Sequence, residues 1–330
     1  MGRIVRGVLH AALDAGIDVH LLSSPARPWS DDPAAPLFAS MHFASPASAA
    51  RRGAYDVVWY PWIGVRFGAA APTLAHIHDT FALHERGNWI ARRRVRVPLR
   101  RAARTATRIA TDSSWSAEQI RKELHVRTER IVVILPAPDP FFFPGKDEPD
   151  PTLPAAPYVL MVGADEPRKN ARFLVEAFGD AFPHGGVRLA IVGRLAEDAE
   201  REAFAHGIKL HREERVDDAR LRALYRNAAC VAVPSLAEGF GLVVVEAQAC
   251  GAPVIASNAT SLPEAAGDAA ILLSPHDGAA WRDALREVVE DESVALRLRA
   301  LGVARFAAGS RDEPARAILA VLDDLVHERA

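Results

Sequence analysis

The chain alternates between two patterns of apolar residues. Short apolar runs rich in β-branched residues are typical of buried strands, and apolar residues spaced every three or four positions are typical of amphipathic helices. Strands separated by helices predict an α/β chain with parallel sheets and crossover helices. The predicted strands cover 17–23, 55–60, 73–78, 109–112, 130–135, 158–163, 188–193, 208–211, 230–233, 253–257 and 270–273.

Signals for helix starts and ends agree with this alternation. Asn170 and either Asp217 or Asp218 stand where a side chain would cap a helix, and Ser261 with Glu264 has the spacing of a capping box. Gly251 follows an apolar stretch, as expected of a left-handed residue that closes a helix. The other predicted helices cover 2–13, 117–124, 277–306 (two helices) and 310–328.

A proline-rich segment divides the chain. Residues 144–157 contain five prolines, which can neither donate to a sheet nor continue a helix, so this segment is predicted to be an interdomain linker. A length of 330 residues suits two domains of ordinary size. We expect an N-terminal Rossmann-like domain at 1–143, a second at 158–309 and a cleft between them, with the helix at 310–330 packing back toward the first.

The first predicted element is a helix, where α/β units usually begin with a strand. The helical pattern from Gly2 to Leu13 leads directly into the strand at 17–23. The N-terminal domain is therefore expected to lack its first strand. Two explanations stay open at this point: a start assigned downstream of the true one, or a domain whose function is impaired.

A glycine-containing loop between a strand and a helix is the first candidate for chemistry. Gly239 and Gly241 follow the strand at 230–233, and backbone N–H groups at a helix N-terminus form a ready anion site. Glu238 lies in this loop, and Glu246 lies within the apolar helix that follows. A carboxylate on such a helix needs a partner, which can be a sugar hydroxyl or a structural arginine.

Two more candidates follow other strands. Lys169 stands just before a predicted helix start, where it can neutralise a diphosphate or be a solvated turn residue. His78 ends a strand of the first half, and its ring can donate to a substrate hydroxyl or a leaving phosphate, or serve a structural role.

Composition excludes several classes of function. The net charge of −2 gives no argument for binding nucleic acid. The two cysteines, Cys230 and Cys250, lie in apolar runs and are predicted to be core residues in a reducing compartment. No Walker motif, Gly-x-Gly-x-x-Gly after a strand, zinc-ligand spacing, signal peptide or membrane span is seen, so we expect a cytoplasmic protein without metal or cofactor.

An arginine-rich segment stands out in the first half. Residues 89–108 contain eight arginines and no acid, and part of the segment has helical spacing. A basic amphipathic helix of this kind, at 92–108, can bind an anionic membrane surface from the cytoplasmic side. The alternatives are a solvated helix face or a face toward a phosphate-bearing cleft.

Taken together, the motifs resemble the retaining glycosyltransferases of family four, also described as glycosyl transferases group 1, which have the GT-B fold. The resemblance covers most of the chain and is strongest from Tyr158 to Pro275. The motifs that carry it in order are Val162-Gly163, Glu166-Pro-Arg-Lys-Asn170, Leu224-Tyr225, Pro234-Ser235, Glu238-Gly-Phe-Gly-Leu242, Glu246-Ala247, Cys250-Gly251, Pro253-Val-Ile-Ala256 and Ser261-Leu-Pro-Glu264. The first half is similar to the acceptor domain, with Gly2-Arg3 as its glycine loop and His78-Asp79 at its strand end.

The resemblance implies a role for each matching position. It implies a catalytic set of Glu238, His78 and Lys169, in which Glu238 holds the transferred sugar and Lys169 the diphosphate. Glu246 would accept from the nucleotide ribose, and Gly193-Arg194 with Val216 would line the nucleobase pocket. The remaining donor-binding positions are Gly163, Arg168, Gly239, Phe240, Gly241 and Leu242.

The resemblance therefore implies a metal-independent, retaining, mannosyltransferase-like enzyme of polysaccharide or cell-envelope biosynthesis. Its partners would be a GDP- or UDP-sugar and a glycan or lipid-linked acceptor. Two departures are Ala164, where the family often has arginine, and Val243, where it often has proline. The alternative hypothesis is a truncated, catalytically impaired GT-B homologue that binds a nucleotide or a partner protein. A sugar epimerase or a phosphorylase is a weaker alternative.

Overall fold

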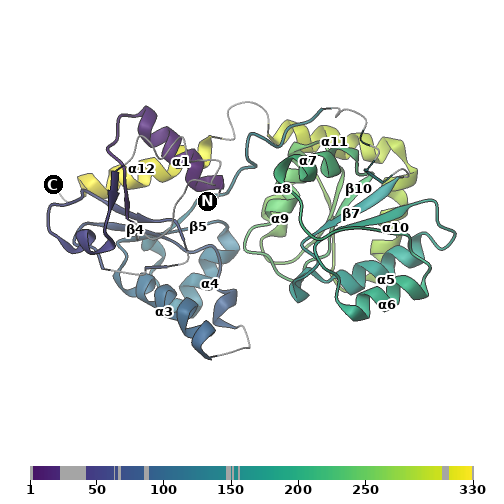
Figure 1. Cartoon of the computed structure of the whole chain (residues 1–330), viewed down its shortest axis with the longest axis horizontal. Coiled ribbons are helices and arrows are strands. Elements are labelled where there is room, and N and C mark those ends of the chain that lie inside the picture. The colour runs from purple at the N-terminus through teal and green to yellow at the C-terminus, as the bar shows by residue number, and fades with distance from the viewer. Residues whose placement is uncertain are drawn as a thin grey trace. The chain divides into compact units, whose positions relative to one another are not determined.

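A computed structural model shows two α/β units. It describes residues 3–22, 42–62, 64–65, 68–84, 89–145, 150, 152–154, 157–306 and 312–328. The N-terminal unit comprises Met1–Ala137 and Asp312–Ala330, and the C-terminal unit comprises Pro138–Arg311 (Figure 1). The division falls before the predicted linker, because Phe142 is fully buried in the core of the C-terminal unit. Gly2, half of the predicted glycine loop, lies outside the described residues, and Arg3 begins helix α1.

The N-terminal unit has a four-stranded parallel sheet in the order β3-β4-β5-β6 and a separate parallel pair, β1-β2. Helix α1 is the first element described, and the predicted lack of a first strand stays a prediction. The chain order is α1 (Arg3–Asp14), β1 (His20–Leu22), β2 (His42–Ala44), η1 (Pro46–Ala50), β3 (Val58–Tyr60), β4 (Thr73–His76), η2 (Phe81–Leu83), α3 (Trp89–Thr105), β5 (Arg108–Thr111), α4 (Ser114–Leu124), η3 (Thr128–Arg130), β6 (Ile131–Val133) and, at the end of the chain, α12 (Glu313–His327).

The last helix belongs to the N-terminal unit. Helices α1 and α12 lie side by side (Figure 1), and Val8 packs in one buried cluster with Ala315 and Ile318. The same cluster includes Leu74 of β4, so the two helices cover one face of the four-stranded sheet. The apolar face of α12 thus packs against residues that are far away in the sequence.

The C-terminal unit has a six-stranded parallel sheet in the order β12-β11-β10-β7-β8-β9. Its elements are β7 (Tyr158–Val162), η4 (Pro167–Lys169), α5 (Ala171–Ala181), β8 (Arg188–Val192), α6 (Glu197–Ala205), β9 (Leu210–Glu213), α7 (Asp218–Asn227), β10 (Cys230–Val233), α8 (Leu242–Ala249), β11 (Val254–Ser257), α9 (Leu262–Ala266), β12 (Ile271–Leu273), α10 (Gly278–Glu290) and α11 (Glu292–Arg305).

Helices cover both faces of this sheet. Successive residues of a strand point to opposite faces, and β7 follows this rule. Tyr158 and Leu160 pack in one core cluster with α7, α8 and α9, while Val159 and Met161 pack in the other with α5, α6 and α10. Burial on both faces explains why these strands are continuous apolar runs in the sequence.

The cap predictions met different outcomes. Of the two predicted candidates, Asp217 caps α7 by accepting from the N–H of Arg220 at 2.7 Å. Gly251 ends α8 with φ 78°, as predicted. Asn170 and Ser261 stand at helix starts, but neither side chain makes a capping hydrogen bond, so the capping predictions for these two residues are wrong. Their side chains hydrogen-bond to loops around the candidate site instead.

Two further features bear on the sequence predictions. Cys230 and Cys250 are buried free thiols, as predicted for core residues. None of the described helices is both long enough and apolar enough to cross a membrane.

Candidate functional site

The site of the C-terminal unit lies where three neighbouring parallel strands end. Strands β7, β10 and β11 are adjacent, so the residues that follow them meet at one edge of the sheet. These residues form three loops, at 163–170, 234–241 and 258–261. They carry most of the positions that the sequence assigned to donor binding.

Glu238 is the centre of a charged cluster. Its Oε1 accepts from Lys169 Nζ at 2.7 Å and from Ser235 Oγ at 2.8 Å. Its Oε2 accepts from Arg168 Nη1 at 2.5 Å. Glu238 is 6% exposed and Lys169 is 8% exposed, so the solvated-lysine alternative is wrong. Residues predicted separately as sugar-binding and phosphate-binding are therefore in direct contact.

Lys169 and Arg168 stabilise the ionised form of Glu238. Burial alone would raise the pKa of Glu238, but the charges of Lys169 and Arg168, with the hydrogen bonds to Glu238, bring its pKa below the usual value. Arg168 also contacts Glu166, with its Nε 2.8 Å from a carboxylate oxygen. The arrangement holds two basic side chains beside one buried carboxylate.

The loop that carries Glu238 is clamped through its backbone. Thr260 Oγ1 accepts from the N–H of Glu238 at 2.9 Å and donates to the Glu238 carbonyl at 3.1 Å. Ser261 Oγ is 2.8 Å from the same carbonyl and 2.9 Å from that of Phe240. Thr260 has φ 52°, a left-handed conformation that is strained for a β-branched residue. Such strain persists where surrounding contacts determine the backbone, as these hydrogen bonds do.

Asn170 joins this loop to the rest of the site. Its Nδ2 donates to the carbonyls of Pro234 at 3.2 Å and Pro275 at 3.0 Å. Asn170 itself has φ 61°, a conformation that asparagine tolerates better than most residues. Its side chain therefore holds the loops after β10 and β12 against the start of α5.

The glycines of the loop place a helix start beside the cluster. Gly241 has φ 114° and stands directly before α8, and a Cβ there would lie 2.8 Å from the Leu262 side chain. The first N–H groups of a helix have no partner inside the helix and carry partial positive charge. Phe240 is buried in the core, whereas Leu242 is exposed. An anion at this start would be favoured, as the sequence predicts.

Glu246 is buried inside the unit. It is 3% exposed, and Tyr225 Oη donates to its Oε2 at 3.3 Å. Tyr225 is itself fully buried and packs edge-to-face on Phe142. The hydroxyl of Tyr225 on helix α7 is thus one partner of this carboxylate. The sequence had offered a sugar hydroxyl or a structural arginine as the partner.

The other predicted donor-binding residues lie at the ends of β7, β8 and β9. Gly163 has φ 84° and donates its N–H to the Val192 carbonyl at 2.8 Å. Gly193 has φ 107°, and a Cβ there would lie 2.9 Å from the backbone N of Ala164. Arg194 is exposed and lies 3.4 Å from Glu214, and Val216 is half-buried against the core under α7.

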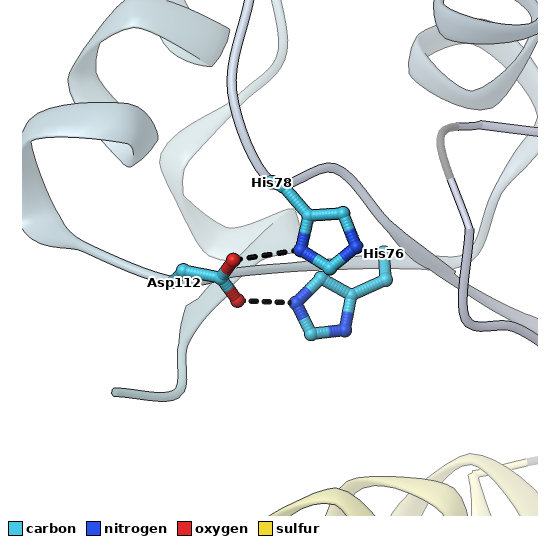
Figure 2. A group of neighbouring side chains, drawn as sticks. All are labelled: His76, His78 and Asp112. Atoms are coloured by element: carbon cyan, nitrogen blue, oxygen red, sulfur yellow. Dashed lines mark hydrogen bonds and ion pairs between the residues drawn. The ribbon is translucent and has the colours of Figure 1, made fainter. Parts of the chain in front are cut away.

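The N-terminal unit holds a second cluster, around His78. Asp112 lies between two imidazole rings: His76 Nε2 is 2.7 Å from its Oδ1, and His78 Nδ1 is 2.6 Å from its Oδ2 (Figure 2). The two rings stack with centroids 4.5 Å apart. His76 ends β4 and Asp112 follows β5, and these strands are neighbours in the sheet. His78 is therefore not an isolated histidine, and both a sugar-binding and a structural role for it stay predictions.

The second cluster also shifts the acidity of its members. Burial lowers the pKa of His78, but the hydrogen bond and charge of Asp112, the charge of Asp79 and the Pro61 backbone outweigh it and raise this pKa above its usual value. Burial raises the pKa of Asp112, but the two imidazoles bring it down to about 2. Asp112 is an ionised, buried carboxylate at neutral pH.

Sequence reasoning missed several residues of both clusters. Tyr225 and Ser235 stood within the quoted motifs without a role, and Thr260 was not singled out. Asp112 and His76 were noted only as parts of strands. The spacing His76-x-His78 was the one available signal, because residues two apart on an extended chain point to the same side. The pairing with Asp112 depends on strand neighbours and carries no local signal.

Comparison with known proteins gives a family match for the segment that carries the Glu238 cluster. Residues 156–291 match the family described as "Glycosyl transferases group 1". The chain is 31% identical over 209 residues to the "O-antigen chain mannosyltransferase B" of Escherichia coli, covering 57% of this chain and 53% of that protein. The chain thus spans about half the length of this curated relative.

Solved structures agree on the fold. A glycosyltransferase from Rickettsia africae superposes with a TM-score of 0.75 at 14% identity, covering 98% of this chain and 94% of the other. HepE from Anabaena, in a complex with UDP and glucose, superposes with a TM-score of 0.68 at 19% identity, covering 97% and 96%. The predicted resemblance to the glycosyl transferases group 1 and the GT-B fold class are confirmed, whereas retention and family four stay predictions. The segment 156–291, which contains the whole Glu238 cluster, therefore belongs to the glycosyl transferases group 1 family.

Proposed function

We propose that this protein transfers a sugar from a nucleoside-diphosphate sugar to a glycan or lipid-linked acceptor in polysaccharide or cell-envelope biosynthesis. The observation that carries the proposal is the cluster of Glu238, Lys169 and Arg168 inside the segment that matches the family. The name of the Escherichia coli relative supports an acceptor in a polysaccharide and mannose as the sugar. The complex of HepE with UDP and glucose supports a UDP-sugar as donor, and a GDP-sugar stays the second candidate.

The chemistry proposed for the cluster follows from its charges. Departure of the diphosphate builds negative charge on its oxygens, which fixed donors stabilise. Lys169, Arg168 and the start of α8 beside Gly241 provide such donors at one sheet edge. Diphosphate binding would draw the two cations partly away from Glu238, freeing its oxygens to accept from sugar hydroxyls.

The remaining roles are assigned by position. We propose that Glu246 accepts from the ribose, that Gly193, Arg194 and Val216 line the nucleobase pocket, and that His78 is the contribution of the N-terminal unit to sugar binding. We further propose that the reaction retains the anomeric configuration without a protein nucleophile, and that the resident groups suffice without a metal.

We also propose that helix α3 binds an anionic membrane surface from the cytoplasmic side. One stripe of the helix is exposed, and Val97 lies within it at 51% exposure. The exposed arginines of the stripe are Arg93, Arg94, Arg100, Arg101 and Arg104. Two arginines of the predicted segment serve the fold instead, since Arg96 donates to the Leu83 carbonyl at 2.6 Å and Arg108 pairs with Glu328.

The experiment is a screen of UDP- and GDP-sugars for release of the nucleoside diphosphate and for thermal stabilisation. We expect one donor to be turned over, and Glu238→Ala and Lys169→Ala each to reduce turnover roughly 100-fold or more. The matched control is Glu176→Ala, which removes an exposed carboxylate of α5 paired with Arg172.

Wild-type turnover in both cluster variants would contradict the assignment. Stabilisation by a nucleotide without turnover of any donor would instead support the alternative, a nucleotide-binding homologue without transferase activity.

A further inference from the structure

His76, His78 and Asp112 form a hydrogen-bonded group in the N-terminal unit. His76 is fully buried, Asp112 is 8% exposed, and the His78 side chain is 35% exposed. Figure 2 shows the carboxylate of Asp112 directed at both rings, with one oxygen for each ring. The three residues therefore form a chain of contacts that runs from the buried core of the unit to its surface.

The buried end of this chain fixes its proton positions. His76 Nδ1 is buried and has no hydrogen-bond partner among the described residues. An orphaned buried N–H is rarer and more unfavourable than an orphaned acceptor. Nδ1 is thus the ring nitrogen without a proton. The proton of His76 lies on Nε2, which donates to Asp112 Oδ1. A neutral imidazole carries one N–H, so this contact sets the tautomer of His76.

The exposed end follows from the same reasoning. The second oxygen of Asp112, which is ionised, can only accept, so His78 Nδ1 must carry a proton. His78 Nε2 is then the ring nitrogen that does not face Asp112, and a ligand there would share the ring with the Pro61 backbone. With its ring stacked on His76, His78 is held both in tautomer and in orientation.

We propose that Asp112, itself held by His76, is a positioning residue that locks His78 with Nδ1–H toward the carboxylate and presents Nε2 to a hydroxyl of the sugar substrate. This rests on the proposed function in naming a sugar as the ligand. The locked ring can accept from a hydroxyl through Nε2 when neutral and donate to one when protonated. The charged groups facing His78 are Asp112 and Asp79, and the Pro61 backbone also contacts it.

The first experiment reads the tautomer directly and needs no activity. Two-bond ¹H–¹⁵N spectra of the histidines distinguish a protonated Nδ1 from a protonated Nε2. We expect neutral His78 in the wild-type protein to carry its proton on Nδ1, with a pKa above the usual value of histidine. A neutral His78 with the proton on Nε2 would overturn the proposal without any variant having to fold.

Asp112→Asn gives the matching test. The amide has one acceptor and one donor group, and the Nε2–H of His76 claims the acceptor. The NH₂ group then faces His78 Nδ1, which becomes an acceptor, so the proton of His78 moves to Nε2. We expect this switch and a lower pKa of His78 in Asp112→Asn, and neither in Glu118→Gln, an exposed carboxylate of α4 in the same unit. An unchanged tautomer would contradict the inference.

A double-mutant cycle tests the effect on transfer. Asp112→Asn is expected to lower kcat roughly 10- to 100-fold, and His78→Gln by at least as much. In the His78→Gln background, Asp112→Asn should have no further effect, because Asp112 acts through His78. An undiminished loss in that background would show a merely structural role and overturn the proposal.

Two further outcomes distinguish the positioning role of Asp112 from the proposed transferase function and from a metal site. If the wild-type protein turns over no nucleotide sugar, the proposed function fails while the tautomer spectra still decide the role of Asp112. Stoichiometric binding of Zn²⁺ that is lost in Asp112→Asn would overturn the hydrogen-bonded arrangement, because a metal would take the place of the two protons.

Discussion

The two units each bury a carboxylate at the end of a parallel strand, but they balance its charge in different ways. Glu238 of the C-terminal unit lies against the side chains of Lys169 and Arg168. Asp112 of the N-terminal unit lies between two imidazoles, whose charge depends on pH. In both cases the hydrogen-bonded partners bring the pKa of a buried acid below its usual value.

The difference shows what each cluster can do. A lysine and an arginine keep their charge across the physiological range, so the Glu238 cluster offers a fixed field suited to an anionic ligand such as a diphosphate. Histidines can give up their protons, so the Asp112 cluster can change its charge without leaving a cation buried. We therefore expect the C-terminal unit to bind an anionic group and the N-terminal unit to orient a ring that can exchange a proton.

The largest expected effect comes from removing each carboxylate charge in turn. Glu238→Gln leaves two cations beside a neutral group, and we expect a loss of about 3 kcal/mol in the free energy of unfolding of the C-terminal unit. Asp112→Asn is expected to lose less, because the His76 ring is inferred to be neutral and the His78 ring can become neutral. Urea unfolding of both variants measures this, with Glu176→Gln and Glu118→Gln as exposed controls. Equal losses would remove the distinction between the clusters.

A second expected effect is the dependence of stability on pH. The pKa of Asp112 is depressed to about 2, so its contribution, about 2 kcal/mol, is fully present above the unfolded value near 4 and is lost as pH falls toward 2. The pKa of His78 is raised, so its contribution is fully present below its unfolded value near 6.5 and is lost as pH rises through the folded value.

Unfolding of the wild-type protein and of His78→Gln between pH 5 and 9 isolates the histidine. The wild-type protein should lose its stability advantage over the variant as pH rises. A constant difference between the two proteins would contradict the raised pKa of His78.

A smaller effect is expected at the clamp on Glu238. Thr260→Ala removes both side-chain hydrogen bonds to the Glu238 backbone and keeps an unfavourable left-handed φ, so we expect a loss of about 1–2 kcal/mol and a higher KM for the donor. Thr260→Ser keeps the hydroxyl and should restore both quantities. Failure of serine to restore them would show that the methyl group, rather than the hydroxyl, matters here.

The smallest effect per residue is expected on the exposed stripe of α3. Each exposed arginine near an anionic bilayer contributes about 1 kcal/mol to binding. Arg94→Ala should therefore weaken sedimentation with phosphatidylglycerol-containing vesicles only a few-fold, and loss of several stripe arginines should abolish it. Lys122→Ala on α4 is the control for a lost exposed cation. Equal binding to neutral vesicles would contradict the electrostatic proposal.

Several parts of the fold could be predicted from local pattern alone. The apolar runs marked β7, β10 and β11 because strands buried on both faces are continuously apolar. Asp217 and Gly251 were identified as helix boundaries because a cap depends only on residues a few positions away. The glycine loop with Glu238 was found for the same reason.

The predictions that were wrong concern side chains whose hydrogen-bond partners are distant in the sequence. Asn170 and Ser261 have the composition of caps, but their side chains hydrogen-bond to carbonyls 64 and 21 or more residues away. Arg96 reads as part of a basic surface, yet it donates to carbonyls of η2. A local sequence pattern shows which donors and acceptors a side chain has. It does not show which partners the folded chain brings near that side chain.

The alternation of strands and helices and the identity of the Glu238 loop follow from the sequence, since both depend on residues close together along the chain. The contacts by which Lys169 and Arg168 share one carboxylate, and by which Asp112 joins His76 to His78, exist only in the folded units. These contacts arise because β10 lies beside β7, and β5 beside β4. The order of strands in a sheet is set by packing over the whole unit, which leaves no mark at any single position of the sequence.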